Sequence, residues 1–240
     1  MSAREPILNV PRAVTLAAGL MVAVQVAMSL LPFDAGVRVF LTLAMIPARY
    51  TGGGAEIPGG YIAAVTSFVT YMIVHGGWLH LLVNVLWMLA FGTAVARRVP
   101  LSSFFAFSIL CGIAGALTHL VFHWGEMAPM VGASAAISGQ MAAALRFIFF
   151  ARSGPHGEIP DFAHVPLASL NETLRSGKVM GFIVFWLVLN TYFGMTSMSF
   201  GAGPDSEIAW EAHIGGFLCG LLVFGYFDSV RSGPDVERVQ

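Results

Sequence analysis

The stretch Ala212–Gly220, AHIGGFLCG, decides the fold because it places a histidine and three glycines inside an otherwise apolar run. A histidine in a lipid-spanning helix is costly and rare, so we interpret His213 as a functional group with a partner nearby. A second apolar stretch, Gly132–Gly139 (GASAAISG), carries Ser134. A histidine beside a serine is the smallest set of side chains that can activate a hydroxyl as a nucleophile. The two stretches together predict a serine–histidine pair inside a membrane protein.

The composition places the chain in a lipid bilayer. Hydrophobic residues make up 57% of the 240 residues and charged residues only 10%, against about 25% charged residues in an ordinary soluble domain. The net charge of −1 gives no reason to expect a nucleic-acid partner. Cys111 and Cys219 both lie in apolar runs, and we interpret them as reduced packing residues. We therefore expect one all-α membrane domain over residues 13–227, with short tails at 1–12 and 228–240.

Six segments come close to the roughly 20 apolar residues that cross a hydrocarbon core. They are Ala13–Leu31, Leu79–Ala96, Ser103–Phe122, Ala133–Phe150, Val179–Thr196 and Ile208–Phe227. The first resembles a secretory signal peptide but lacks a clear small-residue cleavage site, so we expect a retained helix. A further apolar run, Tyr61–Val74, has only 14 residues. We expect it to form an interfacial or re-entrant segment.

The basic residues predict how the chain is oriented. Ten of the 12 lysines and arginines fall in alternate connections, and only Arg38 and Arg49 fall on the other side. By the positive-inside rule, we expect both termini in the cytoplasm. The polar connection over 151–178 is expected to be a cytoplasmic loop without a core. No Arg/Ser-rich transit-like leader is evident, which favours the inner (plasma) membrane of a bacterial cell.

This topology brings four polar groups together. Spans two, four and six run in the same direction, so their N-terminal ends share the extracytoplasmic face. His80 and Asn84 lie in the first turns of span two, Ser134 opens span four, and His213 lies near the start of span six. A neutral imidazole can accept the proton of a serine hydroxyl, and helix-end N–H groups can stabilise negative charge on a substrate oxygen. The convergence predicts acyl-transfer chemistry near the outer surface.

Small residues form one stripe on span four and another on span six. The first consists of Ser134, Ser138 and Ala142, and the second of His213, Gly216 and Gly220. Small residues let membrane helices approach closely. We therefore expect spans four and six to pack against each other, as a contact between serine and histidine requires.

With these residues in place, the chain resembles the rhomboid family of intramembrane serine proteases from about Thr66 to Phe227. Three matched pieces carry the resemblance: HGGWLHLLVN at 75–84, GAS at 132–134 and AHIGG at 212–216. The resemblance implies a six-helix bundle with an interfacial first loop. It implies Ser134 as the nucleophile and His213 as general base and acid. It further implies an oxyanion site formed by His80, Asn84 and the backbone N–H of Ser134.

The resemblance also implies a biological activity, the cleavage of other membrane proteins in or near a transmembrane segment. Single-span proteins in the surrounding bilayer would be the substrates, and no cofactor is expected. We expect His75 to be a supporting hydrogen-bond group near the site. Gly132, Gly216 and Gly220 are expected to support the site as well.

Three positions depart from the family's pattern. Rhomboids usually have glycine directly after the nucleophile, where this chain has Ala135. The added methyl group is expected to crowd the nucleophile turn and to slow or restrict activity. Many members carry an aromatic residue four positions after the nucleophile, where this chain has Ser138, and many bacterial members have a Trp–Arg pair where Ala48 precedes Arg49. None of these departures removes a catalytic group.

Several polar residues have simpler interpretations. Ser138 is a rival nucleophile, but we expect its hydroxyl to bond the carbonyl four residues back. His119 and His123 have the spacing of a metal pair, but two ligands are too few for a closed site, so we expect no metal. Glu211 stands two residues before His213 and should face elsewhere. We therefore expect a catalytic dyad without a carboxylate.

Two other functions remain open from the sequence. A non-catalytic rhomboid-like protein that binds membrane helices would generally lack the nucleophile or the base, whereas this chain keeps both. A transporter is expected to show internal repeats or paired broken helices, and we find no convincing repeat in the sequence. The sequence does not reveal the oligomeric state.

Overall fold

The computed structural model describes residues 10–52, 56–151, 162, 164–196 and 209–229. Over these ranges the regular structure consists of helices without a strand, so the predicted all-α membrane bundle is confirmed. Most of both predicted tails and Ile208, the expected start of span six, lie outside the described residues.

The helices follow one another through short connections. In chain order they are α1 (Arg12–Ser29), α2 (Phe33–Leu43), η1 (Pro47–Tyr50), α3 (Gly60–Thr70), η2 (Tyr71–Ile73), α4 (Trp78–Trp87), η3 (Met88–Gly92), α5 (Thr93–Ala96), α6 (Leu101–Phe122), α7 (Ser134–Ile148), α8 (Leu170–Arg175), α9 (Gly177–Met195) and α10 (Trp210–Phe227). A π-helical segment, η3, joins α4 and α5 into one apolar helix over Trp78–Ala96.

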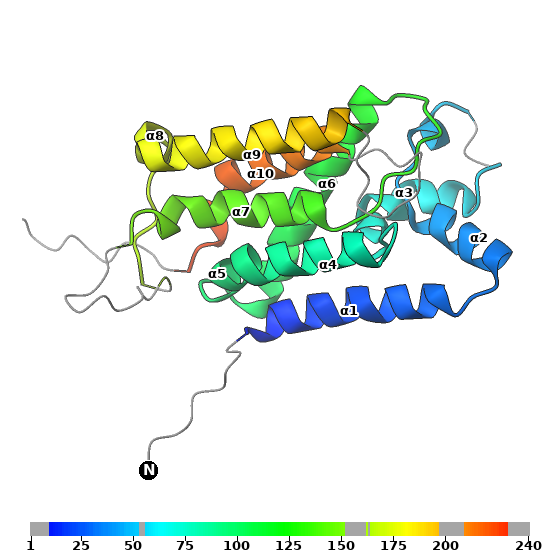
Figure 1. Cartoon of the computed structure of the whole chain (residues 1–240), viewed down its shortest axis with the longest axis horizontal. Coiled ribbons are helices and arrows are strands. Elements are labelled where there is room, and N and C mark those ends of the chain that lie inside the picture. Colours follow the sequence, from blue (N-terminus) through cyan, green and yellow to red (C-terminus); the bar gives the residue numbers. More distant parts are fainter. Residues whose placement is uncertain (1–9, 53–55, 152–161, 163, 197–208, 230–240) are drawn as a thin grey trace, which may run out of the picture.

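Among the described residues, five helices are long and apolar enough to cross a membrane: α1, the α4–α5 helix, α6, α9 and α10. The expected fourth span is shorter than predicted, because α7 has only 15 residues. All residues from Ala135 to Phe147 in α7 are buried. Figure 1 shows α7 between α9 and α4, with α6 and α10 behind it. Since other helices rather than lipid surround α7, it need not match the full thickness of the hydrocarbon core.

Glycines bring α10 into close contact with α7. A Cβ atom on Gly216 would overlap the carbonyl of Ala135, and one on Gly220 would overlap the backbone of Gly139. The predicted approach of spans four and six is therefore present. The stripe on α7 that faces these glycines consists of Ala135 and Gly139, one position along from the predicted Ser134 and Ser138. That shift leaves the two serines facing the cavity described below.

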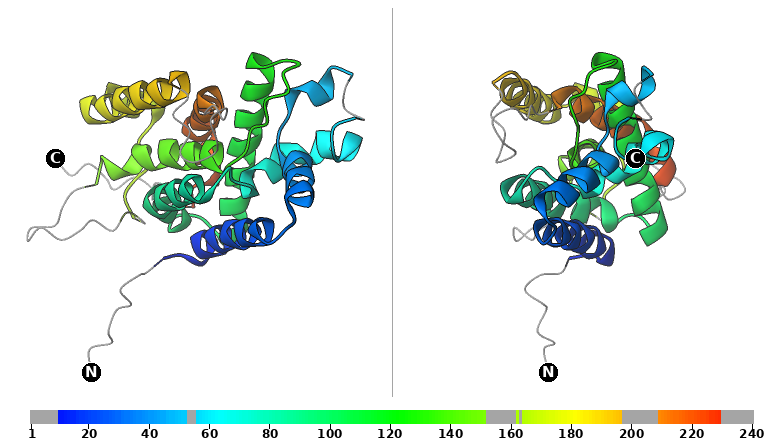
Figure 2. Two further views of the ribbon diagram at one scale, coloured as in Figure 1. Left: turned by 45° about the vertical axis from the view of Figure 1, so that its right-hand side comes forward. Right: turned by 90° about the vertical axis from the view of Figure 1, so that its right-hand side faces the viewer.

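The other face of α10 packs on α6. Gly215 lies against Thr118 of α6, whose hydroxyl donates to the carbonyl of Ala114. In Figure 2, α6 rises across the bundle at a steep angle to α7. The first turn of α10 is thereby held between α6 and α7, which fixes the position of His213.

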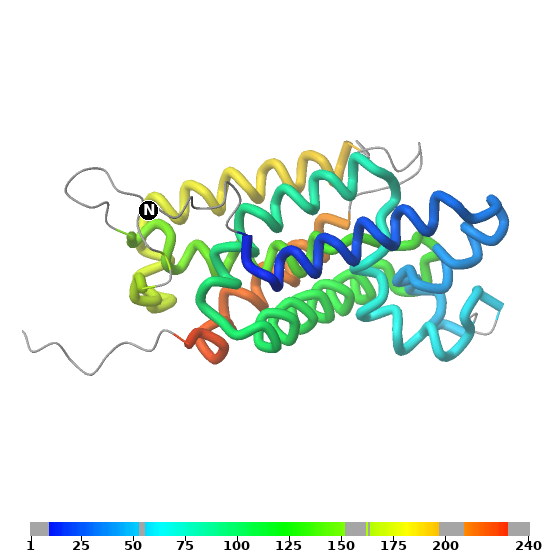
Figure 3. Tube along the Cα trace, turned by 90° about the horizontal axis from the view of Figure 1, so that it is seen from below, coloured from blue at the N-terminus to red at the C-terminus, as the bar shows by residue number. Residues whose placement is uncertain are grey.

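Two short helices, α2 and α3, lie together at the end of the molecule farthest from α8 (Figures 1 and 3). The run Tyr61–Val74 forms α3 and η2, shorter than a membrane span as expected, whereas α2 was not predicted. Arg49 ties the two helices together by donating to the carbonyls of Leu41 and Pro58. Arg49 is only 4% exposed, and burial lowers the pKa of its guanidinium group.

At the opposite end, Arg98 holds the connection after α7 against the bundle. Its guanidinium donates to both carboxylate oxygens of Asp228, at 3.1 and 2.6 Å. It also donates to the carbonyls of Phe162 and Val165, at 2.8 and 2.6 Å. Four charge-assisted hydrogen bonds thus link three distant parts of the chain.

The expectation that residues 151–178 form a loop without a core is wrong for the part that the structure describes. Arg146 donates from Nε and Nη2 to the carbonyl of Ala168, at 3.1 and 3.0 Å. α8 follows with a capping box in which Ser169 and Glu172 bond each other's backbone N–H. The polar composition of this segment suggested an open loop. The sequence of the segment does not show that buried arginines of the bundle bind its backbone carbonyls.

Candidate active site

Ser134 and His213 meet at the interface between α7 and α10. The hydroxyl oxygen of Ser134 lies 2.7 Å from Nε2 of His213. Ser134 is the first residue of α7, and His213 lies in the first turn of α10. The close approach of these helices at their glycines makes this contact possible. The spatial meeting expected from the sequence is therefore present.

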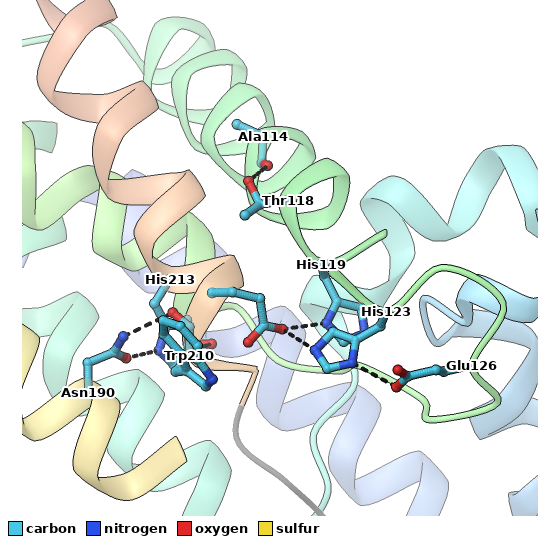
Figure 4. A network of polar contacts seen from close by, with 10 residues as sticks. Ala114, Thr118, His119, His123, Glu126, Asn190, Trp210 and His213 are labelled. Carbon is cyan, nitrogen blue, oxygen red and sulfur yellow. Dashed lines mark hydrogen bonds and ion pairs between the residues drawn. The ribbon is translucent and has the colours of Figure 1, made fainter. Parts of the chain in front are cut away.

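Asn190 of α9 fixes the orientation of the imidazole. Its Oδ1 lies 2.6 Å from Nδ1 of His213, and its Nδ2 donates to the carbonyl of Trp210 at 2.9 Å (Figure 4). Because Oδ1 of Asn190 can only accept, Nδ1 of His213 carries the proton. Nε2 then presents its lone pair to the hydroxyl of Ser134.

The sequence analysis missed Asn190. The expected pair of Ser134 and His213 thus has a third polar neighbour, the amide of Asn190, which is not a carboxylate. An amide inside an otherwise apolar membrane helix was the available signal, because such residues usually face a partner in the bundle.

His80 and Asn84 lie on α4 beside the turn that precedes Ser134. The backbone N–H of Gly76 donates to Nδ1 of His80 at 3.4 Å, so Nε2 of His80 carries the proton. One N–H of the Asn84 side chain donates to the carbonyl of His80 at 2.9 Å, which leaves the other N–H available. Both side chains line the same cavity as Ser134 and His213. Two side-chain donors therefore lie near the serine.

Gly132 lets this turn approach α4. Its φ of +110° lies in the region that favours glycine, and a Cβ atom there would lie 2.7 Å from Nε2 of His80. Its backbone N–H donates to the carbonyl of Tyr71 at 2.9 Å. Any side chain at this position would displace His80 or the turn before Ser134.

His75 lies directly beside His80. Its ring packs edge-on against His80, with the centroids 5.2 Å apart. Within the described residues, neither ring nitrogen of His75 has a hydrogen-bond partner. Burial, with a smaller contribution from the neighbouring His80, lowers the pKa of His75 to about 3. His75 is therefore a neutral group that packs against His80.

A cavity of about 980 Å³ opens at these residues. Its polar lining includes Ser134, His213, His80 and Asn84. Aromatic side chains from α4 and α9 form much of the remainder, namely Trp87, Phe182, Phe185, Trp186 and Phe193. A large apolar cavity with a few convergent polar groups is the usual form of a binding or active site.

Comparison with known proteins identifies the family. The sequence profile of the Rhomboid domain matches residues 63–229. The chain belongs to the rhomboid family. It is also similar to RHOMBOID-like protein 4 of Arabidopsis thaliana, with 26% identity over 173 residues. That alignment covers 68% of this chain and 36% of the plant protein, so the chain spans about a third of the length of that relative.

Ala135 stands directly after Ser134, where rhomboids usually have glycine, and the structure shows where the methyl group of Ala135 lies. A Cβ atom on Gly115 of α6 would lie 2.5 Å from Cβ of Ala135 and 2.7 Å from the carbonyl oxygen of Ala212. The methyl group thus fits against α6 because residue 115 has no side chain. The crowding expected at the turn around Ser134 is relieved on the α6 side.

We expect Gly115→Ala to destabilise this rhomboid by about 1 to 3 kcal/mol, since it overfills a packed interface. Adding Ala135→Gly should recover part of the loss, because the contact with Ala212 remains. Thermal unfolding of the single and double variants in detergent measures both effects. Equal stability of Gly115→Ala and the wild type would show that α6 and α10 do not pack as described.

Ser138 occupies the position where many rhomboids have an aromatic residue. Its hydroxyl donates to the carbonyl of Ser134 at 2.8 Å, which is the bond predicted from the sequence. The hydroxyl proton of Ser138 is thus engaged by the backbone, whereas Ser134 has an imidazole beside its hydroxyl.

The two histidines at the end of α6 have a third neighbour. Nδ1 of His119 lies 2.6 Å from Oε1 of Glu211, and Nε2 of His123 lies 3.2 Å from the same oxygen. Glu211 thus contacts these two histidines, whereas Nδ1 of His213 contacts Asn190. We expected no metal because only two ligands were counted. That count is wrong, because α10 adds the carboxylate of Glu211 to His119 and His123.

Proposed function

We propose that this rhomboid is an intramembrane serine endopeptidase that cleaves other membrane proteins in or near a transmembrane segment. The observation that carries the proposal is the 2.7 Å contact between Oγ of Ser134 and Nε2 of His213. A hydroxyl becomes an effective nucleophile when a neighbouring base accepts its proton. Family membership and the multi-pass membrane fold support the same conclusion.

The reaction would begin with attack by Oγ of Ser134 on the carbonyl carbon of the scissile peptide bond. The hydroxyl proton passes to Nε2 of His213, and the carbonyl oxygen becomes an oxyanion. His213 then gives the proton to the leaving amine as the C–N bond breaks, which leaves an acyl-enzyme. Water, activated by the same imidazole, hydrolyses the ester and restores Ser134.

Three donors would stabilise the oxyanion. They are the Nε2–H of His80, the second N–H of the Asn84 side chain, and the backbone N–H of Ser134 at the start of α7. Such donors act strongly because they are already oriented when the charge develops.

The substrate would enter from the lipid between α4 and α9. Residues of both helices line the cavity, with Trp87 on the α4 side and Phe182 and Phe185 on the α9 side. A transmembrane helix hides its carbonyl groups in hydrogen bonds, so the substrate must unwind locally before Ser134 can attack. Helix-weakening residues near the cleavage site should therefore favour cleavage.

The distribution of basic residues supports a specific orientation in the membrane. We infer that both termini lie in the cytoplasm of a cell whose inner membrane holds the protein, with Ser134 near the extracytoplasmic face. Water for deacylation would then reach the cavity from that side.

Reconstituted liposomes test the function. The full chain and Ser134→Ala are each incubated with a panel of single-span membrane proteins, and the products are mapped by mass spectrometry. We expect the wild type to cut at least one protein in or near its transmembrane segment, and Ser134→Ala to cut none. If every protein stays intact and both samples merely bind the helices equally well, the non-catalytic alternative holds instead.

Asn190 is expected to act as a positioning residue for His213. Asn190→Ala leaves the Nδ1–H of a buried imidazole without its acceptor, which costs about 1 to 3 kcal/mol. We expect kcat to fall roughly 10- to 100-fold with little change in KM.

Asn190→Asp keeps an acceptor for the imidazole and should retain more of the activity, and Asn171→Ala on α8 is the control. A rise in KM with unchanged kcat, or an equal loss in the alanine and aspartate variants, would argue against a positioning role.

A further inference from the structure

A second cluster of ligating groups lies beside the proposed active site. His119 is in the last turn of α6, His123 follows the end of that helix, Glu126 lies in the next turn, and Glu211 is in the first turn of α10. In Figure 4, His119, His123 and Glu126 form a group toward α6, apart from His213 and Asn190. All four members of the cluster line the 980 Å³ cavity.

The donor atoms have the spacing of a metal site. One ligand atom from each of His119, His123 and Glu211 lies within 4.8 Å of the other two. Zinc bonds of roughly 2.0 to 2.2 Å place the ligand atoms of a tetrahedral site about 3.3 Å apart. Nε2 of His123 and Oε1 of Glu211 are already 3.2 Å apart. The 2.6 Å contact of Nδ1 of His119 with that oxygen would have to open by about 0.7 Å to reach this spacing.

Glu126 prepares His123 as a ligand. Its Oε2 lies 2.7 Å from Nδ1 of His123, so Nδ1 carries the proton and donates it to the carboxylate. In the neutral ring, Nε2 of His123 presents a lone pair toward the carboxylate of Glu211, which also accepts. A carboxylate behind a histidine fixes the ring and its tautomer in many metal sites. Two facing lone pairs are stabilised by a cation between them.

Burial gives a second and independent indication. Glu211 is 2% exposed and His119 is 4% exposed, so neither is a solvated surface group. A carboxylate removed from water is costly unless a positive charge offsets it. A divalent ion between the two rings and the carboxylate would supply that charge.

The types of ligand in this cluster indicate which metal ions it would bind. Two imidazoles with one carboxylate suit Zn²⁺ and related transition metals, whereas Mg²⁺ and Ca²⁺ prefer oxygen ligands alone. Three protein ligands leave a fourth position for water or another group, and the cluster faces the cavity.

We propose that His119, His123 and Glu211 form a binding site for a divalent transition-metal ion of the Zn²⁺ class, with Glu126 holding His123. The ion would join the end of α6 to the first turn of α10. Because Glu211 and His213 share that turn, the bound ion would also hold the imidazole of the proposed active site in place. The metal site does not depend on the proposed protease activity.

Metal titration of the full chain in detergent tests the site. After treatment with a chelator, the wild type is titrated with Zn²⁺ by calorimetry, and Co²⁺ is used as a spectroscopic probe of the coordination. We expect about one Zn²⁺ per chain and the visible absorption of Co²⁺ with nitrogen and oxygen ligands. Saturating Zn²⁺ should raise the unfolding temperature by roughly 5 to 10 °C.

Ligand variants locate the ion. Glu211→Gln and His123→Ala should each weaken Zn²⁺ binding at least about 100-fold, and Glu126→Gln about 10- to 100-fold. Glu172→Gln is the matched control, because glutamine preserves the capping box of α8, and it should bind as the wild type does. His123→Ala keeps the test valid if the buried Glu211→Gln fails to fold, since the His123 side chain is 25% exposed.

Two results would overturn the proposal. One is the absence of saturable Zn²⁺ binding by the folded wild type. The cluster would then be only a set of hydrogen bonds that joins α6 to α10. The other is binding that remains undiminished in both Glu211→Gln and His123→Ala, which would place the ion elsewhere.

Discussion

We expect Ser134→Ala and His213→Ala each to lower kcat at least about 10,000-fold, because the nucleophile and its base act as one unit. The 2.7 Å contact between Oγ and Nε2 is the physical reason: without the imidazole the hydroxyl keeps its proton, and without the hydroxyl nothing forms the acyl-enzyme. Initial cleavage rates of a single-span substrate in liposomes measure the effect. The double variant should be no slower than either single one.

Ser138→Ala is the matched control for this experiment. Its hydroxyl lies one turn along α7 and donates to the carbonyl of Ser134, so its loss should leave the rate within a few fold of the wild type. If Ser138→Ala abolished cleavage while Ser134→Ala retained it, the assignment of the nucleophile would be reversed. Multiplying losses in the Ser134→Ala/His213→Ala double variant would contradict a shared proton transfer.

We expect Asn84→Ala to lower kcat roughly 100- to 1,000-fold, the effect of losing one oxyanion donor. One N–H of the Asn84 amide bonds the carbonyl of His80, and the other is available to the substrate oxygen. Because the oxyanion exists only after attack, KM should change little. Steady-state kinetics separate the two constants.

Asn84→Asp sharpens the interpretation. A carboxylate of the same size offers no N–H and places negative charge near the developing oxyanion, so this variant should be slower still than Asn84→Ala. A purely structural role for Asn84 predicts instead that both variants lose activity in proportion to their loss of thermal stability. Thermal unfolding of the two variants beside the wild type distinguishes these cases.

Hydropathy was sufficient to predict most of the bundle, because a lipid-facing helix must be apolar along its whole length. It was less reliable for α7, whose neighbours shield it from lipid and allow 15 residues where about 18 were expected. It also missed α2 and α8, which are too short to produce a membrane signal. Their positions depend on tertiary hydrogen bonds from Arg49 and Arg146.

The meeting of Ser134 and His213 was predictable because alternate spans begin on the same side of a membrane. Asn190 was missed because it lies near the C-terminal end of α9, and only the N-terminal ends of alternate spans were compared. Glu211 was correctly separated from His213 by helix geometry. The geometry of one helix does not show which helix packs against it, however. The contacts of Glu211 with His119 and His123 became apparent only from the packing of α6 against α10.

The central claim is that His213 activates the hydroxyl of Ser134, and labelling with a fluorophosphonate followed by peptide mapping tests it most directly. We expect the wild type to carry one phosphonyl adduct on Ser134, and His213→Ala to carry almost none although it is folded. An adduct on Ser138, or labelling of Ser134 at the same rate in His213→Ala, would contradict this account.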